Sequence, residues 1–186
     1  MAKIYTRSII MGSPCRTWQY SLASTKLTCI REAFRFSTMR ESTWWPRYLG
    51  IAKEVSTWSK DPSTQVGAIA VGTKGQILAQ GYNGYPRGLD DSNYDDRERK
   101  YERIVHAEMN AIYNASWNGV SLDGSDMFVY GLPVCHECAK AIIQVGIKRV
   151  ICPYKEGAPD KWKDSFELTK QFFKEAGVKA ELVRYD

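Results

Sequence analysis

The alternation of helical and strand patterns in the second half of the chain constrains its fold most strongly. Three amphipathic helices are predicted at residues 107–117, 136–145 and 161–176. Short apolar strands follow them at 126–130, 149–152 and 178–183. Ahead of these units, apolar runs at 66–71 and 76–81 flank the turn residues 72–75 and predict a β-hairpin. A hairpin followed by such units implies a mixed sheet of about five strands between helices, a three-layer α/β/α sandwich.

The regular patterning begins near Met39 and is preceded by a segment of different character. Apolar residues recur at helical spacing between Tyr48 and Trp58, which predicts a helix over 44–58 with Ile51, Ala52 and Val55 on its apolar face. Residues 89–103 are dominated by charge and predict a solvated loop that ends in a helical turn. No repeat or second core pattern follows, so residues 39–186 are assigned to one domain.

Residues 1–38 form an N-terminal extension in this interpretation. They are rich in serine, threonine and basic residues and show no sustained hydrophobic period. Three explanations stay open: a flexible tail, an organellar transit peptide, or translated upstream sequence with Met39 as the working start. The third is the one that we favour. A secretory signal is disfavoured, because no compact apolar segment follows the basic residues.

The charge distribution bears on the partners of the chain. The net charge of +5 arises in residues 1–38, which hold six basic residues and one acidic residue, so residues 39–186 are balanced. A polynucleotide is usually met by a basic face, so this balance disfavours DNA or RNA as the main substrate. No apolar run approaches the roughly 20 residues of a transmembrane helix. Five cysteines without dense spacing predict a reducing compartment, and we expect a cytoplasmic protein.

Two short motifs supply candidate metal ligands. His106 and Glu108 open one predicted helix, and the Cys-x-x-Cys formed by Cys135 and Cys138 opens the next. One imidazole and two thiolates suit Zn²⁺, and three protein ligands leave a fourth position open, which is typical of a catalytic site. Helix N-termini also lower the pKa of a thiol and favour the thiolate that binds metal. The sequence therefore predicts one catalytic zinc ion per chain.

Glu108 is the candidate for proton transfer. Zinc acidifies bound water, and a neighbouring carboxylate can take the proton and pass it to a ring nitrogen and a departing amine. Each motif alone has a simpler explanation, since His-x-Glu is often a surface pair and Cys-x-x-Cys a redox pair or half of a structural zinc site. For the structural site, residues 39–186 offer only Cys152, expected in the core, and His136, expected to be solvated.

Longer stretches of the chain resemble the deoxycytidylate (dCMP) deaminase family. The likeness covers about residues 39–155, and His-x-Glu with Cys-x-x-Cys is the signature of zinc nucleobase deaminases. The motifs that carry it are Lys60-Asp61-Pro62-Ser63-Thr64-Gln65-Val66-Gly67-Ala68, Gly81-Tyr82-Asn83-Gly84-Tyr85-Pro86-Arg87-Gly88, His106-Ala107-Glu108-Met109-Asn110-Ala111-Ile112, and the segment from Cys135 to Lys148.

The resemblance implies a cytidine-deaminase-like fold and a set of residue roles. It implies His106, Cys135 and Cys138 as zinc ligands, with Glu108 as the proton shuttle. Substrate contacts are expected from Asn83 to the sugar, from Arg87 to the phosphate, and from Tyr130 and Tyr154 beside the base. A regulatory deoxynucleoside triphosphate would lie at Asp61, Gln65, Gly84 and Gly88. A homo-oligomer is also expected.

The implied reaction is the hydrolysis of dCMP to dUMP and ammonia, which supplies dUMP for thymidylate synthesis. One alternative is a zinc-dependent deaminase of another nucleotide or of a base in RNA. The balanced charge of residues 39–186 disfavours the RNA version. Another alternative is a non-catalytic, zinc-stabilised binding module, in which Glu108 would have no role. The sequence therefore favours a zinc-dependent hydrolase that acts on a small nucleotide.

Overall fold

The computed structural model describes residues 43–92, 94, 96–153 and 162–184. The predicted boundary at residue 39 and Tyr154 lie outside this part of the chain. The helices are α2 (Trp45–Ser56), α3 (Arg97–Arg103), α4 (Ala107–Trp117), α5 (His136–Gln144) and α6 (Lys163–Ala176). The strands are β1 (Gly67–Val71), β2 (Ile77–Tyr82), β3 (Asp126–Tyr130), β4 (Arg149–Pro153) and β5 (Lys179–Val183). Within the described residues, no helix has both the length and the apolarity of a membrane span.

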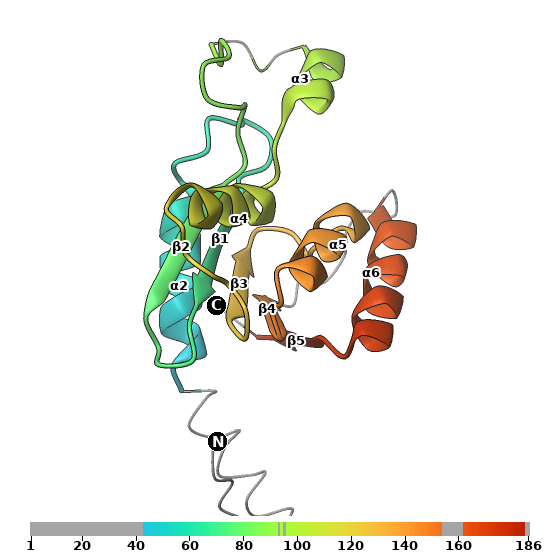
Figure 1. Cartoon of the computed structure of the whole chain (residues 1–186). Coiled ribbons are helices and arrows are strands. Elements are labelled where there is room, and N and C mark those ends of the chain that lie inside the picture. The colour runs from blue at the N-terminus through green and yellow to red at the C-terminus, as the bar shows by residue number, and fades with distance from the viewer. Residues whose placement is uncertain (1–42, 93, 95, 154–161, 185–186) are drawn as a thin grey trace, which may run out of the picture. The chain divides into compact units, whose positions relative to one another are not determined.

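The five strands form one mixed sheet in the order β2-β1-β3-β4-β5 (Figure 1). β1 pairs antiparallel with both β2 and β3, whereas β3, β4 and β5 run parallel to one another. Parallel neighbours need a crossover, and α5 and α6 supply the two crossovers of this sheet. The predicted mixed five-stranded sheet is confirmed.

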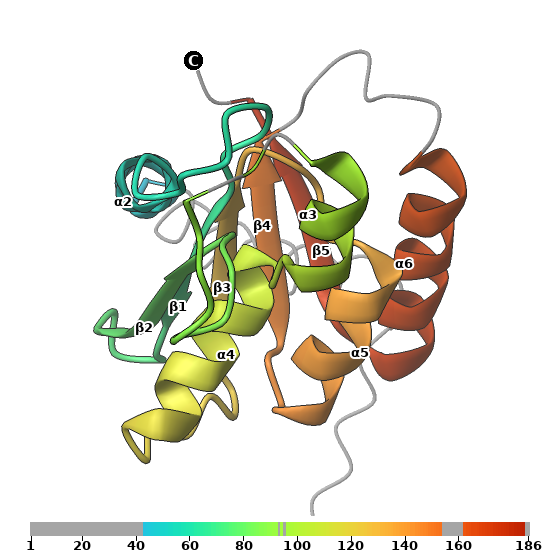
Figure 2. The ribbon, with the colours of Figure 1, turned by 90° about the horizontal axis from the view of Figure 1, so that it is seen from above.

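Alternating side chains divide the core into two layers around the sheet. Phe128 and Ile151 pack with the buried residues of α2 on one face, and Met127 and Val150 pack with residues of α4 and α5 on the other. Successive strand residues point to opposite faces, so both sides of a buried strand need apolar residues. Figure 2 shows α2 on one side of the sheet and α4, α5 and α6 on the other, which confirms the three-layer sandwich.

The apolar face predicted for the first helix is partly wrong. Leu49, Ala52 and Val55 are buried in α2, but Ile51, which we placed on the same face, is 39% exposed. Trp58, the last residue of the predicted helix, lies beyond the end of α2 and is 49% exposed. Leu49 is the residue that the pattern missed, and it belongs to the cluster that contains Phe128. This segment has more apolar residues than one helical face can bury, so the sheet beneath it decides which of them are covered.

Two glycines allow helices to lie directly on the hairpin. A Cβ atom on Gly67 would be 2.1 Å from the carbonyl oxygen of Ala52 in α2. A Cβ atom on Gly81 would be 2.2 Å from the amide nitrogen of Ala111 in α4. Both neighbouring groups are backbone atoms, so neither contact can be relieved by a side-chain rotation.

Substituting Gly81 by alanine is expected to destabilise the protein because α4 would have to move off β2. Overpacking of a buried contact typically costs about 1–3 kcal/mol, and a clash with backbone should reach the upper part of that range. The measurement is the midpoint of urea unfolding. Gly84→Ala is the matched control, since its nearest neighbour would lie 3.5 Å from the new Cβ. Equal midpoints for the two variants would contradict the proposed close packing.

Candidate metal centre and its cavity

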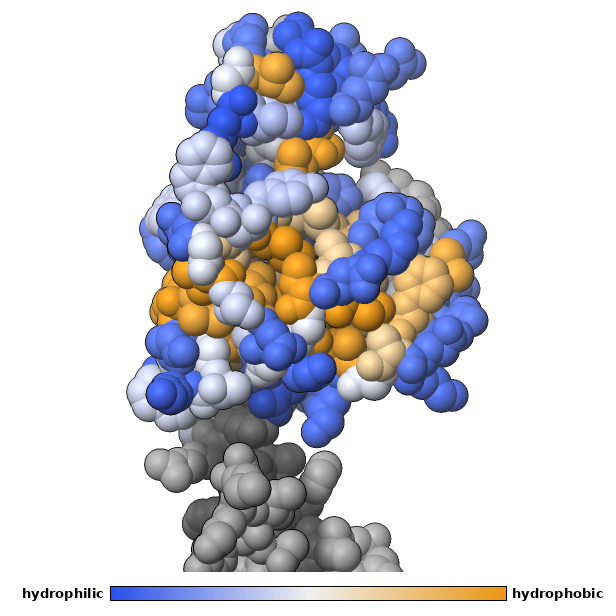
Figure 3. Space-filling view, viewed as in Figure 1, coloured by the Kyte–Doolittle hydropathy of each residue, from blue (hydrophilic) through white to orange (hydrophobic). Residues whose placement is uncertain are grey.

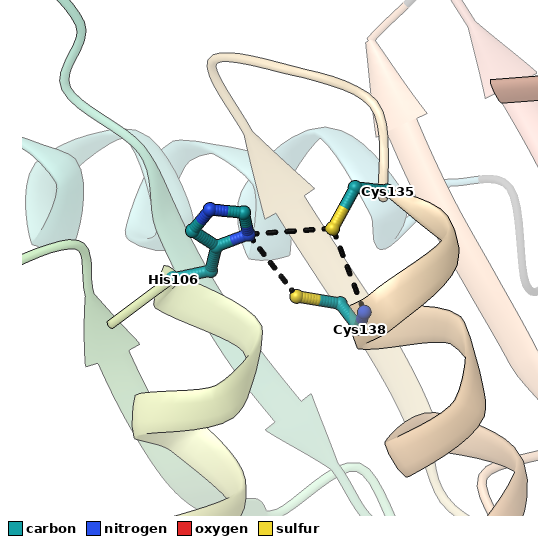
Figure 4. A group of neighbouring side chains, drawn as sticks. All are labelled: His106, Cys135 and Cys138. Carbon is teal, nitrogen blue, oxygen red and sulfur yellow. Dashed lines mark hydrogen bonds between the residues drawn. The ribbon is translucent and has the colours of Figure 1, made fainter. Parts of the chain in front are cut away.

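Two helix N-termini bring three ligand groups together. His106 is the N-cap residue of α4, and Cys135 is the N-cap residue of α5, with its Sγ accepting a hydrogen bond from the backbone amide of Cys138. Cys138 follows in the first turn of α5. Figure 4 shows the imidazole of His106 facing both sulfur atoms across the gap between the two helices.

The geometry of these donors fits a zinc ion. His106 Nδ1 lies 3.3 Å from Cys135 Sγ and 3.4 Å from Cys138 Sγ, and the three donor atoms lie within 4.8 Å of one another. Tetrahedral zinc with ordinary Zn–N and Zn–S bonds would separate such a nitrogen and sulfur by about 3.5 Å. No other group of three or more candidate ligands occurs among the residues that the structure describes. The donor set therefore matches the zinc site expected from the sequence.

The two thiols differ in acidity. The hydrogen bond from Cys138 lowers the pKa of Cys135 to about 4, assisted by His106 and opposed by burial. The same hydrogen bond and burial raise the pKa of Cys138. Because a metal binds thiolates, binding of a cation would release the proton that the two sulfur atoms share.

Glu108 lies in the first turn of α4, beside this metal group. Its carboxyl group is buried, and burial raises its pKa to about 7, although the neighbouring His106 opposes this shift. A carboxyl group with a pKa near neutrality can both accept and donate a proton at the pH of the cell. The site therefore places a carboxyl group that can exchange a proton near neutral pH next to the candidate metal ligands.

A cavity of about 510 Å³ opens over the metal group. His106, Glu108 and Cys135 form part of its lining. Further walls come from the segment before β1, the loops after β2 and β3, α3 and the start of α6. The aromatic side chains at these walls are Tyr94, Tyr101, Trp162 and Phe166. This volume suits a small molecule, since ligand pockets usually span about 300–1,000 Å³.

Asn83 and Asp61 line the cavity but are also bound within the protein. Asn83 Oδ1 accepts a hydrogen bond from the amide of Val66 at 2.8 Å, and its Nδ2 donates to the carbonyl of Thr64 at 2.9 Å. Asp61 accepts hydrogen bonds from the amide and the hydroxyl of Ser63. These contacts fix the loop ahead of β1 against the loop after β2.

Other predicted site residues lie elsewhere. Arg87 donates to Asn114 Oδ1 and lies over the ring of Trp117, and it is not among the described residues that line the cavity. Tyr130 packs with the α2 cluster, and Lys53 lies over its ring, so it is on the opposite face of the sheet from the metal ligands.

The remaining candidates for a regulatory site belong to loops. Gln65 donates from Nε2 to the carbonyl of Ser59, Gly84 pairs with Val105 in an isolated bridge, and Gly88 has a φ of 86°. Of these three residues, none belongs to the described lining of the cavity.

The structure also shows residues around the cavity and the metal group that the sequence pattern did not reveal. Arg97 and Lys100 line the cavity, although the charged segment that contains them was interpreted as solvated. His136, expected to be solvated, is half-buried, and its Nδ1 lies 2.8 Å from Ser165 Oγ on α6. One sequence signal could have placed Arg97 and Lys100 at the cavity. Their helix ends at Arg103, three residues before His106, so it must lie near the metal group.

Comparison with known proteins identifies relatives of this chain. The model of the cytidine and deoxycytidylate deaminase zinc-binding region matches residues 42–153. A protein named an uncharacterized deaminase in the luxG 3′ region of Aliivibrio fischeri is 42% identical over 139 residues, which cover 74% of this chain and 91% of that protein. The deoxycytidylate deaminase of Homo sapiens is 41% identical over 144 residues, with coverage of 72% and 76%.

A solved structure supports the same relationship. The dCMP deaminase from the cyanophage S-TIM5, in complex with dCMP and dUMP, superposes with a TM-score of 0.57 at 29% identity. The superposition covers 74% of this chain and 94% of the phage protein. The family model spans the segment that carries His106, Cys135 and Cys138, so the zinc cofactor expected from the sequence is confirmed. By sequence, fold and metal group alike, the chain belongs to the cytidine and deoxycytidylate deaminase family.

Proposed function

We propose that this protein converts dCMP to dUMP and ammonia by hydrolysis and so supplies dUMP for thymidylate synthesis. One observation carries the proposal: a single cavity contains the candidate zinc ligands His106 and Cys135 together with the buried carboxyl group of Glu108. The names of the relatives support the choice of substrate, since one is a deoxycytidylate deaminase and another was solved with dCMP and dUMP.

In this proposal His106, Cys135 and Cys138 hold the zinc ion. When bound, zinc acidifies a water molecule, so that a nucleophile is available near neutral pH. Glu108 would accept one proton of that water and pass it to the ring nitrogen of the cytosine. It would then take the second proton from the new hydroxyl group and give it to the departing amine. The new bond joins the water oxygen to the ring carbon that carries the amine, and the bond from that carbon to nitrogen breaks, which releases ammonia.

The walls of the cavity suit a flat base. Leu132 and Pro133 lie next to the metal ligand Cys135, and Phe166 and Trp162 contribute aromatic surface from the side of α6. Apolar and aromatic walls exclude bulk water and pack against the faces of a pyrimidine ring. Asn83 remains our candidate contact to the sugar, because it belongs to the lining of the cavity.

The proposed function predicts a strong preference for the free nucleotide. Catalytic efficiency on dCMP should exceed that on deoxycytidine by about 10- to 100-fold, since hydrogen bonds to a charged phosphate typically contribute that much. It should also exceed the efficiency on single-stranded DNA. The measurement is ammonia release by the zinc-loaded protein with each substrate. Equal efficiency on dCMP and deoxycytidine would refute the nucleotide assignment, and faster reaction of the oligonucleotide would indicate a nucleic-acid deaminase.

Four further expectations remain proposals. A homo-oligomer is supported by the exposed apolar side chains of Ile51 on α2, Trp58 just after α2 and Ile77 on β2, which a partner subunit would cover. A cytoplasmic location is supported by the described cysteines, which are all unpaired. Regulation by a deoxynucleoside triphosphate near Asp61, Gln65, Gly84 and Gly88, and a catalytic domain that begins at Met39, rest on the sequence alone.

A further inference from the structure

The short helix α3 forms one wall of the cavity without contributing to the core. None of its seven residues is buried, so apolar packing does not hold it in place. Figure 3 shows a hydrophilic surface over this part of the molecule. Another interaction must therefore fix α3 above the metal group.

A buried ion pair supplies this attachment. Lys100 Nζ lies 2.7 Å from Asp61 Oδ2, 2.8 Å from Asp61 Oδ1 and 2.7 Å from Ser63 Oγ. The two charged side chains are only 12% and 3% exposed. A second lysine–aspartate pair nearby, Lys60 with Asp91, has a similar distance of 2.8 Å but is 64% and 42% exposed. Solvent screens the exposed pair, whereas the loss of one partner from a buried pair is costly.

Asp61 in turn is hydrogen-bonded to other residues of the cavity wall, so it connects α3 to that wall. Its Oδ1 also accepts hydrogen bonds from the amides of Ser63 and Thr64, and its Oδ2 lies 3.4 Å from Asn83 Nδ2. Burial alone would raise the pKa of Asp61, but the hydrogen bonds from Lys100, Ser63 and Thr64 outweigh it and lower that pKa. The carboxylate is therefore ionised at neutral pH, and Lys100 cancels its charge at the cavity wall.

Arg97 lies one helical turn before Lys100 and lines the same cavity. Its interactions within the described part of the chain are with Tyr101, whose hydroxyl lies 3.5 Å from the guanidinium and whose ring lies beneath it. Lys100 has three N–H donors, and its three short contacts already account for them. Of the two α3 cations in the described lining of the cavity, Arg97 is thus the one with donors left for a ligand.

We propose that Arg97 binds the 5′-phosphate of the nucleotide substrate, and that Lys100 is a positioning residue that holds α3, through Asp61, where Arg97 can reach it. The inference rests on the proposed function and names the residues that make the site select a nucleotide over a nucleoside. A guanidinium suits this task, because its planar donors can form two hydrogen bonds with one phosphate.

The first test compares Arg97→Gln with Arg99→Gln. Arg99 lies on the same helix but is not among the described residues of the cavity lining, and its ion pair with Asp90 is long, at 4.0 Å. The ratio of the kcat/KM values for dCMP and deoxycytidine should fall about 10- to 100-fold in Arg97→Gln, mainly through the KM for dCMP. In Arg99→Gln the ratio should stay within about twofold of the wild type.

The second test compares Lys100→Met with Lys60→Met. Removal of Lys100 frees α3 and leaves the charge of Asp61 at the cavity wall, so the KM for dCMP should rise about tenfold or more. Lys60→Met removes an equally short but exposed pair and should change the KM less than twofold. The Lys100 and Arg97 substitutions should not be additive when combined, because both act on one phosphate contact. If Lys100→Met does not fold, Asp61→Asn/Lys100→Met removes both charges and takes its place.

The outcomes separate this inference from the proposed function. A wild-type protein that does not deaminate dCMP would refute the proposed function. A wild-type protein that prefers dCMP, together with an Arg97→Gln variant of unchanged substrate ratio, would overturn the role of Arg97. Two results would overturn the positioning role of Lys100. One is a KM for dCMP that is no higher in Lys100→Met than in Lys60→Met. The other is a combined variant in which the effects of Lys100→Met and Arg97→Gln on the KM for dCMP simply add.

Discussion

Replacing Cys138 by serine is expected to remove both the zinc ion and all measurable deamination. The side chain is buried between α5 and the imidazole of His106, and its Sγ lies 3.4 Å from Nδ1. A serine hydroxyl is not ionised near neutral pH and cannot replace a thiolate ligand, which leaves two protein ligands where a catalytic zinc usually has three. Elemental analysis should show about one zinc per chain in the wild type and almost none in the variant.

Cys135→Ser should behave in the same way, because its Sγ lies 3.3 Å from the same nitrogen. Cys152→Ser is the matched control. Its thiol is buried in the core and is not part of the metal group, so this variant should keep its zinc even if its stability falls. Full zinc content in both Cys135→Ser and Cys138→Ser would show that the metal is bound elsewhere.

Glu108→Gln is expected to lower turnover by about 10²- to 10⁴-fold while the zinc content stays at the wild-type level. Glutamine has nearly the shape of glutamate but cannot carry a proton between water and substrate. Single-turnover rates and zinc analysis on the same preparation measure the two effects. Near-wild-type turnover would exclude Glu108 from the mechanism, and loss of zinc would assign it a role in metal binding instead.

The same substitution should change the pH dependence of stability in the metal-free protein. Burial raises the pKa of Glu108 from 4.5 to about 7, so the folded state binds the proton more tightly than the unfolded state does. Stability should therefore fall as the pH rises from 4.5 to about 7, and remain at the lower level above it. Glu108→Gln should remove this decrease, which thermal unfolding of the metal-free proteins across that range would detect.

The sequence predicted the second half of the fold well because each element there has a clear period and a clear end. The predicted helix 107–117 and strand 126–130 coincide with α4 and β3, and Gly146 and Gly177 end α5 and α6 where expected. The face of α2 was harder to predict. Leu49 and Ile51 are both apolar, and only the position of Phe128 beneath the helix determines which one is buried.

The metal group could be predicted because helix N-termini fix its members within a few residues of each motif. The positions of Arg87 and Tyr130 depended on longer-range geometry. Arg87 follows a loop whose direction no local pattern determines, and it pairs with Asn114 instead. For Tyr130 the signal was present, since it shares the strand face of Phe128, two residues earlier, and that face packs against α2.

The separation between α3 and the core has a consequence for how the substrate preference of this protein could be changed. Since no residue of α3 is buried, changes in its sequence carry almost no penalty in folding, provided that Lys100 and its partner Asp61 are kept. Mutations elsewhere in the cavity wall, as at Glu108 or Ala107, would disturb packed helices. If Arg97 binds the phosphate as proposed, laboratory evolution of this one helix should change the phosphate preference while the metal group stays intact.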